Sequence, residues 1–399
     1  MSRLAAVWGH LAGSATIPQE LIDLIISDTD LDEDSLKSCA LVAHSFLPSS
    51  QKRLFAKLVL EPHRCGPKIK ARLQRLIQVL TASPHIMRHI RELHVIADSE
   101  IEGITVGASL PSPQSCLVST IVTMLTNVET LLLGLNWEAE VPRDLDEAMR
   151  TCLALPSLRT LCFSYIHFGN ATTLISLLRC CSPTLDTVTF LCVTVANEPE
   201  SPTVSCTDAT DTRLQLSSLN LVPLNQFQLE CLEQTVDLRQ LRRLCVKNSW
   251  GGLPPQPLLD ATANITHLEL TLNGDVIGHL PSVSIHHLRR LRALHITIRL
   301  LYPREDCTLA AKLLSTAPDT IENLELEFRV AFEVDFCAIL RCANLEFVIV
   351  TSEMRSLRRV LVAPIYPCPV FTGVSHTVQE TFPELNRRGI LEFRETVHK

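Results

Sequence analysis

A recurring apolar unit constrains the fold of this chain more than any other feature. Two apolar residues stand three apart and a third follows after one intervening residue, as in Leu158-Leu161-Phe163 and Leu291-Leu294-Ile296. Successive copies are separated by roughly 28 residues on average. The other copies are Ile90-Leu93-Val95, Val128-Leu131-Leu133, Leu185-Val188-Phe190, Leu216-Leu219-Leu221, Leu241-Leu244-Val246, Ile265-Leu268-Leu270, Ile321-Leu324-Leu326 and a weaker one at Cys342-Leu345-Phe347.

The segments between the copies carry apolar residues at helical spacing, for example Leu73, Leu76, Ile77 and Leu80. Each repeat is therefore predicted to be a short strand followed by a helix. One such unit cannot bury its own apolar face, so neighbouring units must stack. The pattern resembles leucine-rich repeats. It predicts an α/β solenoid over residues 63–399, with a parallel sheet on the concave side and helices on the convex side.

Two polar stretches interrupt the rhythm, at residues 98–114 and 194–213. The second contains Pro199 and Pro202 among Ser, Thr, Asp and Glu residues. Both are predicted to be surface loops of the solenoid. Residues 1–15 are predicted to be an N-terminal tail.

Composition excludes several classes of protein. The chain is 46% apolar with a net charge of −7, which argues against a large nucleic-acid interface. Its 15 cysteines include no Cys-x-x-Cys pair, which favours a reducing compartment, cytoplasm or nucleus. No apolar run is long enough for a membrane span. No nucleophile elbow or phosphate-binding glycine loop occurs, so we expect no enzyme activity, cofactor or metal site.

Residues 16–62 differ from the repeats and predict three short helices. Thr16 and Gln19 form a capping-box pattern, and Pro18 lies in the first turn. An apolar stripe follows at helical spacing, beginning with Leu21. A second helix is predicted around Leu36. A third is predicted to carry Leu54, Phe55 and Leu58.

This segment resembles the F-box. Ile17-Pro18 and Glu20-Leu21 match its opening, and Leu47-Pro48 leads into its third helix. The string from Ser35 to Pro48 is similar to the large fungal F-box families, in which divergent leucine-rich repeats follow the box. The resemblance implies a surface that binds a Skp-family adaptor and, through it, a cullin-RING ligase core. The residues expected to form this surface are Ile17, Pro18, Leu21, Ile22, Ile25 and Leu36.

The resemblance implies a substrate-recognition adaptor of an SCF-type ubiquitin ligase, in which the repeats bind a protein target. Two alternatives remain open on sequence grounds. One is an interaction scaffold whose box no longer docks, because Phe46 stands where the family usually has tryptophan. The other is an enzyme on an α/β fold, which would require a pocket with convergent polar groups.

Side chains that flank the inward apolar positions must point to the concave face, because side chains alternate along a strand. Arg243 and Lys247 form a basic spot in this set. Toward the C-terminus the set is expected to form an acidic target-binding surface that suits a partner with a basic element. The expected contact residues are His267, Glu269, His295, Glu325, Glu327 and Glu346. The alternative is an ordinary solvated sheet surface.

Overall fold

The computed structural model describes most of the chain. The described residues are 18–27, 31–42, 44–61, 67–96, 112–134, 141–195, 213–223, 226–247, 255–273, 283–300, 307–330, 344–352, 354–366, 374–394 and 396–397. The predicted tail at 1–15 lies outside these residues, as does most of the two predicted loops. Within those loops, residues 112–114 begin a helix and residues 194–195 form a short strand, so the loop boundaries were drawn too wide.

Helices and strands alternate through most of the chain. The strands are β1 Lys57–Leu60, β2 Glu92–Ile96, β3 Thr130–Gly134, β4 Thr160–Ser164, β5 His167–Phe168, β6 Thr187–Leu191, β7 Thr194–Val195, β8 Ser218–Val222, β9 Arg243–Lys247, β10 His267–Asn273, β11 Ala293–Leu300, β12 Asn323–Val330, β13 Arg359–Tyr366, β14 Leu391–Phe393 and β15 Thr396–Val397. The helices are α1 Gln19–Ser27, α2 Glu33–Val42, α3 Leu47–Leu54, α4 Pro67–Ala82, α5 Pro84–Met87, α6 Ser112–Met124, α7 Arg143–Leu153, α8 Ala171–Arg179, α9 Gln226–Thr235, α10 Gln256–Ala261, α11 Thr308–Ser315, α13 Leu345–Thr351, α14 Val374–Thr381 and α15 Pro383–Arg387, with a 3₁₀ turn η2 at Leu238–Gln240.

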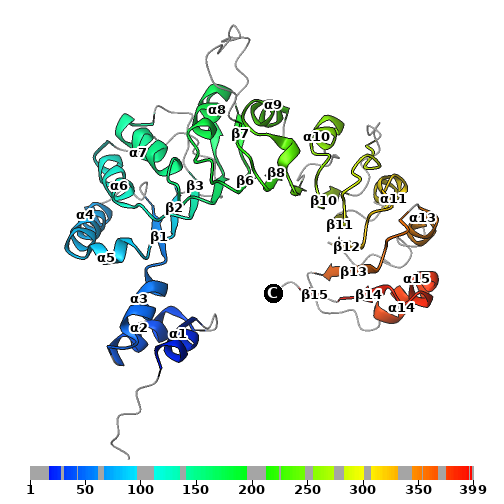
Figure 1. Ribbon diagram of the computed structural model, residues 1–399, viewed down its shortest axis with the longest axis horizontal. Coiled ribbons are helices and arrows are strands. Elements are labelled where there is room, and N and C mark those ends of the chain that lie inside the picture. Colours follow the sequence, from blue (N-terminus) through cyan, green and yellow to red (C-terminus); the bar gives the residue numbers. More distant parts are fainter. Residues whose placement is uncertain are drawn as a thin grey trace, which may run out of the picture.

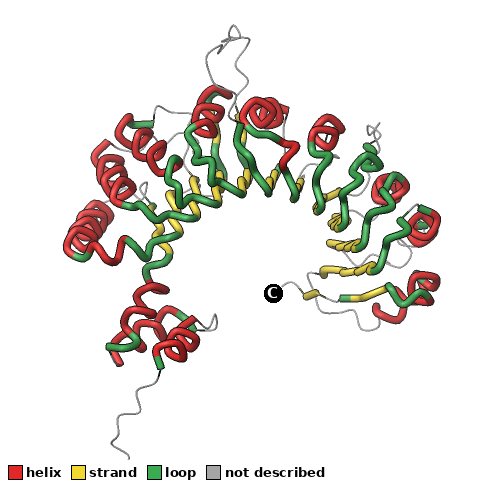
Figure 2. Tube along the Cα trace, in the orientation of Figure 1, coloured by secondary structure: helices red, strands yellow, loops and turns green. Residues whose placement is uncertain are grey.

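The strands form one long parallel sheet that follows chain order. Its order is β1-β2-β3-β4-β6-β8-β9-β10-β11-β12-β13-β14, and β15 also pairs with β13. Figure 1 shows an open arch with the strands along its inner side and the helices along its outer side. Figure 2 shows the same separation, with the described helices from α4 onward on the convex side of the sheet. The predicted α/β solenoid of leucine-rich-repeat type is confirmed.

The repeated apolar unit lines the core between the sheet and the helices. In β4, for example, Leu161 and Phe163 are fully buried, and the Leu158 that precedes them is buried too. The register joins equivalent positions across strands, because Leu161 pairs with Leu131 on one side and Val188 on the other. Each leucine thus stacks on the same position of its neighbours, so every repeat depends on the next one for its core.

Aromatic residues reinforce this stack near the middle of the arch. The rings of Phe163 and Phe190, on neighbouring strands, lie 5.4 Å apart in a stacked arrangement. Phe168 of β5 meets Phe163 edge-on at 5.8 Å. All three rings are fully buried. The arrangement fills a part of the core where leucine alone would leave unfilled space between the repeats.

The predicted strands from 93–95 to 324–326 are all found, parallel and in chain order. The sheet, however, starts earlier than expected. Leu58 was predicted in the third helix but lies in β1, which pairs with β2 through Leu58 and Leu93. The sheet also continues further, through β13, β14 and β15. Among the described residues, no helix combines the length and apolar character needed to cross a membrane.

Substitution of a buried aromatic tests whether stability is local to neighbouring repeats. Phe190→Ala should cost about 3–5 kcal/mol of local stability, because it removes a stacked ring and leaves a cavity. Hydrogen exchange should therefore accelerate in β4, β6 and β8 while β12 and β13 stay protected, since repeats contact only their neighbours. Leu41→Ala serves as the control, because Leu41 is exposed. Equal acceleration along the whole sheet would contradict this account of the core.

Candidate functional site

The three N-terminal helices form a small unit with its own core. Ile22 and Ile26 of α1 pack with Leu36 of α2, and Phe46 and Leu54 cover this cluster. Figure 1 places the unit beyond the N-terminal end of the arch, below β1. We call residues 18–54 the helical box. Its core is separate from the continuous core of the solenoid.

The outer face of α1 is apolar and exposed. Leu21, Leu24 and Ile25 are 49%, 68% and 50% exposed, respectively. They share one face of α1, because residues three or four apart lie on the same side of a helix, and this face differs from the one that buries Ile22 and Ile26. Each exposed aliphatic side chain forgoes the favourable free energy of burial, and a cluster of them typically marks an interaction surface.

The predicted adaptor-binding residues divide into two groups. Leu21 and Ile25 are exposed on α1, and Pro18 is exposed just before it. Ile22 and Leu36 are only 1% and 5% exposed, so they hold the box together and cannot themselves contact a partner. Ile17 lies outside the described residues. Leu24 was not predicted, although its spacing from Leu21 places it on the same helix face.

Hydrogen bonds fix α1 against α3. Ser49 donates to the Asp23 carboxylate, and Gln19 donates to the same group at 2.9 Å. These bonds hold the pKa of Asp23 below its usual range. Arg53 of α3 donates to the main-chain oxygens of Ile26 and Leu31, which closes the end of α1. The orientation of the exposed apolar face is therefore set by polar contacts on the opposite side of α1.

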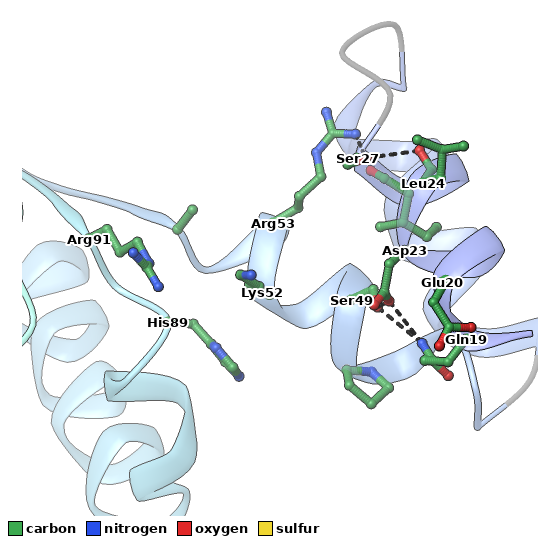
Figure 3. A pocket seen from close by; sticks show the side chains of 13 residues that line it. Gln19, Glu20, Asp23, Leu24, Ser27, Ser49, Lys52, Arg53, His89 and Arg91 are labelled. Carbon is green, nitrogen blue, oxygen red and sulfur yellow. Dashed lines mark hydrogen bonds between the residues drawn. The ribbon is translucent and has the colours of Figure 1, made fainter.

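A cleft of about 920 Å³ separates the box from the first repeat. Figure 3 shows Gln19, Asp23 and Ser49 on the box side and His89 and Arg91 on the solenoid side, with Lys52 between them. Burial and the nearby charges of His85, Lys52 and Arg91 lower the pKa of His89. The solenoid wall of the cleft thus carries His89, whose neutral form is favoured, and Arg91, which forms an ion pair with Glu129.

The box joins the solenoid without a linker. Helix α3 ends at Leu54 and β1 begins at Lys57. The main-chain oxygen of Ala56 accepts bonds from both Arg91 and Glu92, each at 2.9 Å, so the connection belongs to the sheet ladder. The direction in which α1 points is therefore coupled to the first repeat.

The C-terminal half of the concave face carries carboxylates, but they are paired with cations. Glu269 lies 2.8 Å from Lys247, and Glu327 lies 2.7 Å from Arg329. Glu325 lies 4.0 Å from Arg394. The carboxylates of the expected acidic surface are therefore charge-compensated. Lys247 reaches Glu269 from the neighbouring strand β9, Arg329 lies two residues from Glu327 on the same strand, and Arg394 follows β14.

His295 lies at the centre of this charge network. Its ring nitrogens are 3.9 Å from Glu269 and 3.7 Å from Glu327. Burial opposes protonation of the ring, but the nearby carboxylates of Glu327, Glu325 and Glu269 outweigh it and raise the pKa of His295. His295 and Arg329 lower the pKa of Glu327 to about 2. They outweigh burial, which acts in the opposite direction.

The structure brings five of the six predicted target-binding residues together. His267, Glu269, His295, Glu325 and Glu327 occupy concave positions on β10, β11 and β12. Glu346 does not belong to this group, and its prediction was wrong. It lies in α13, where its carboxylate accepts the main-chain N–H groups of Glu384 and Leu385 at 2.6 and 3.1 Å. It thereby caps the start of α15.

Several cysteines are held as neutral thiols. Burial raises the pKa of Cys152 and of Cys181 to about 12. Burial, with the charge of Glu269, raises the pKa of Cys245 to about 12 as well. A thiol must ionise to act as a nucleophile, so these cysteines serve packing at neutral pH. Among the described residues, no group of His, Cys, Asp and Glu side chains could hold a metal ion.

Comparisons with known proteins find similarity among solved structures. No family model matches the sequence, and the comparison with curated proteins gives no match. The leucine-rich repeat-containing protein LegL7 from Legionella pneumophila is similar in structure, with a TM-score of 0.40 and 11% sequence identity. The similarity covers 82% of this chain and 98% of that protein.

The charge network predicts a pH-dependent contribution of His295 to stability. A raised pKa means that the stabilisation is complete below the unfolded value of 6.5 and is lost as pH rises through the folded value. His295→Gln should therefore lower the free energy of unfolding by about 1 kcal/mol at about pH 6 and leave it almost unchanged at about pH 9. Urea unfolding at both pH values measures this difference. His286→Gln is the control, and a cost that grows with pH would refute the assignment.

Proposed function

We propose that this chain is a non-catalytic adaptor of an SCF-type ubiquitin ligase. In this proposal the helical box binds a Skp-family adaptor, and the concave sheet binds a protein target. The observation that carries the proposal is the exposed apolar face of α1, formed by Leu21, Leu24 and Ile25, on a unit separate from the solenoid. The likeness of residues 17–60 to the F-box supplies the identity of the partner.

The chemistry of the α1 face supports a protein partner for the box. An amphipathic helix whose apolar side is exposed is a recurrent mode of protein recognition, in which the side chains enter a hydrophobic groove. Three large aliphatic side chains at Leu21, Leu24 and Ile25 form such a row. The hydrogen bonds at Asp23 preset the orientation of the helix, which lowers the entropic cost of docking.

The mechanism is proximity. A target held on the concave face would stand at a fixed position relative to the box and hence to the ubiquitin carrier. Holding two reactants together raises their effective concentration, so the chain itself supplies no reacting group. The direct passage from Leu54 of α3 to Lys57 of β1 supports this role, because it limits motion between the two binding surfaces.

Docking through α1 predicts a specific loss of adaptor binding. Leu24→Asp should reduce the affinity for a purified Skp-family subunit by at least about a hundredfold, because it places a charge on the apolar face. Binding is measured by calorimetry with the full chain. Val79→Asp is the matched control, since Val79 is also exposed but lies on α4. Unchanged affinity for Leu24→Asp would exclude this helix as the docking surface.

The short junction between α3 and β1 predicts that ubiquitin transfer depends on a fixed spacing between the two binding surfaces, as well as on binding itself. Insertion of a Gly-Ser segment between Ala56 and Lys57 should leave adaptor and target affinities within about twofold, because neither surface is altered. Ubiquitin transfer to the target should nevertheless fall about tenfold, because effective concentration drops with a flexible spacer. A transfer rate equal to that of the parent chain would show that rigid spacing has no role.

A further inference from the structure

A small hollow opens on the concave face around Ala293. Ala293 lies in register between His267 of β10 and Asn323 of β12, and its methyl group leaves space where the flanking strands carry larger side chains. The hollow has a volume of about 190 Å³, which is the scale of one amino-acid side chain. Arg243 lies at its β9 end and Arg359 at its β13 end.

One charged group at the hollow has no ion-pair partner among the described residues. The hollow is lined by two arginines and two glutamates, and three of these four groups are paired, Glu269 with Lys247, Glu325 with Arg394, and Arg359 with Glu392. Arg243 makes no ion pair with any described residue and is exposed. Its guanidinium is therefore the charged group of the hollow that is left for a ligand.

The neighbouring histidines add no negative charge that could pair with Arg243. His267 is in register with Arg243, and burial together with the Arg243 charge lowers the pKa of His267. His295 lines the hollow from β11 and becomes cationic when protonated. Protonation of either ring therefore adds positive charge beside Arg243.

A wider groove continues from Arg243 along β6, β8 and β9, with a volume of about 1140 Å³. Charged residues line its β9 and β10 side and Asp186 one end, whereas the floor, formed by strand positions of β6 and β8, is uncharged and, apart from Val222, polar. Asn220 there donates to Thr189 at 3.0 Å, and Thr187 and Ser218 lie in register beside them. Unlike the α1 face, such a floor suits the main chain of a peptide, whose N–H and C=O groups need polar partners.

We propose that the concave face recognises an acidic segment of the target, with one Asp or Glu side chain seated in the hollow against Arg243. The main chain of this segment lies along the groove beside β6 and β8. The proposal rests on the target-binding part of the proposed function, and it reverses the target charge expected from the sequence. A guanidinium binds a carboxylate through two parallel hydrogen bonds, which fixes the position of the anchor.

A carboxylate is favoured over a phosphate by the charge of the hollow. Arg243 is the one charged lining group without an ion pair to a described residue, and Glu269 and Glu325 line the same space. A phosphate carries up to two negative charges and is generally bound by clusters of arginine. A dianion in this hollow would leave one charge unpaired near two carboxylates, whereas a single carboxylate is matched by Arg243.

The test uses selection from a random peptide library on the purified full chain, followed by affinity measurements on synthetic peptides. Selected peptides should share an Asp or Glu anchor. Replacing the anchor with its amide should weaken binding about tenfold, and Arg243→Gln should produce the same loss. Combining both changes should add no further loss, because they remove the same contact.

Two variants define the controls and the contrary outcomes. Arg243→Glu should shift the selected anchor to Lys or Arg, whereas Arg72→Gln on the convex helix α4 should change nothing. Failure to select any binder, a basic anchor with the parent chain, or tighter binding of a phosphoserine anchor would each overturn the proposal. Adaptor binding through α1 is measured separately, so its loss is distinguishable from loss of the peptide site.

Discussion

The structure depends on lateral stacking of equivalent leucines between neighbouring repeats. A strand of about five residues followed by one helix has no interior of its own, so its apolar side must be covered by the units before and after it. The parallel register that aligns Leu161 with Leu131 and Val188 provides this cover along the arch. The same register leaves every second side chain free on the concave face, which makes a continuous surface available for binding.

The helical box does not depend on neighbouring repeats for its core. The surface on α1 is therefore separate from the concave surface of the solenoid. Its core is closed by Ile22, Ile26 and Leu36 without help from the repeats. Three aliphatic side chains outside that core, Leu21, Leu24 and Ile25, share one face of α1, and Leu41 and Val42 of α2 are exposed as well. One chain thus carries an apolar surface at one end and a polar, charged surface within the arch.

Sequence reasoning predicted the strands well, because the apolar spacing reports burial on alternating positions. It failed where local spacing was ambiguous. Leu54 and Leu58 are four apart, which fits a helix, yet Leu58 belongs to β1. Leu345 and Phe347 alternate like a strand but lie in α13. The pairing of Glu269 with Lys247 could not be predicted, because cross-strand partners are fixed only once the register of separate repeats is known.

The central claim is that α1 binds a Skp-family subunit while the concave face remains available for a target. Hydrogen exchange of the full chain, with and without that subunit, tests it most directly. The account predicts added protection in α1, at Gln19–Ser27, and unchanged exchange in β9 through β13. Protection on the concave strands, or no protection of α1 at saturating subunit, would contradict it.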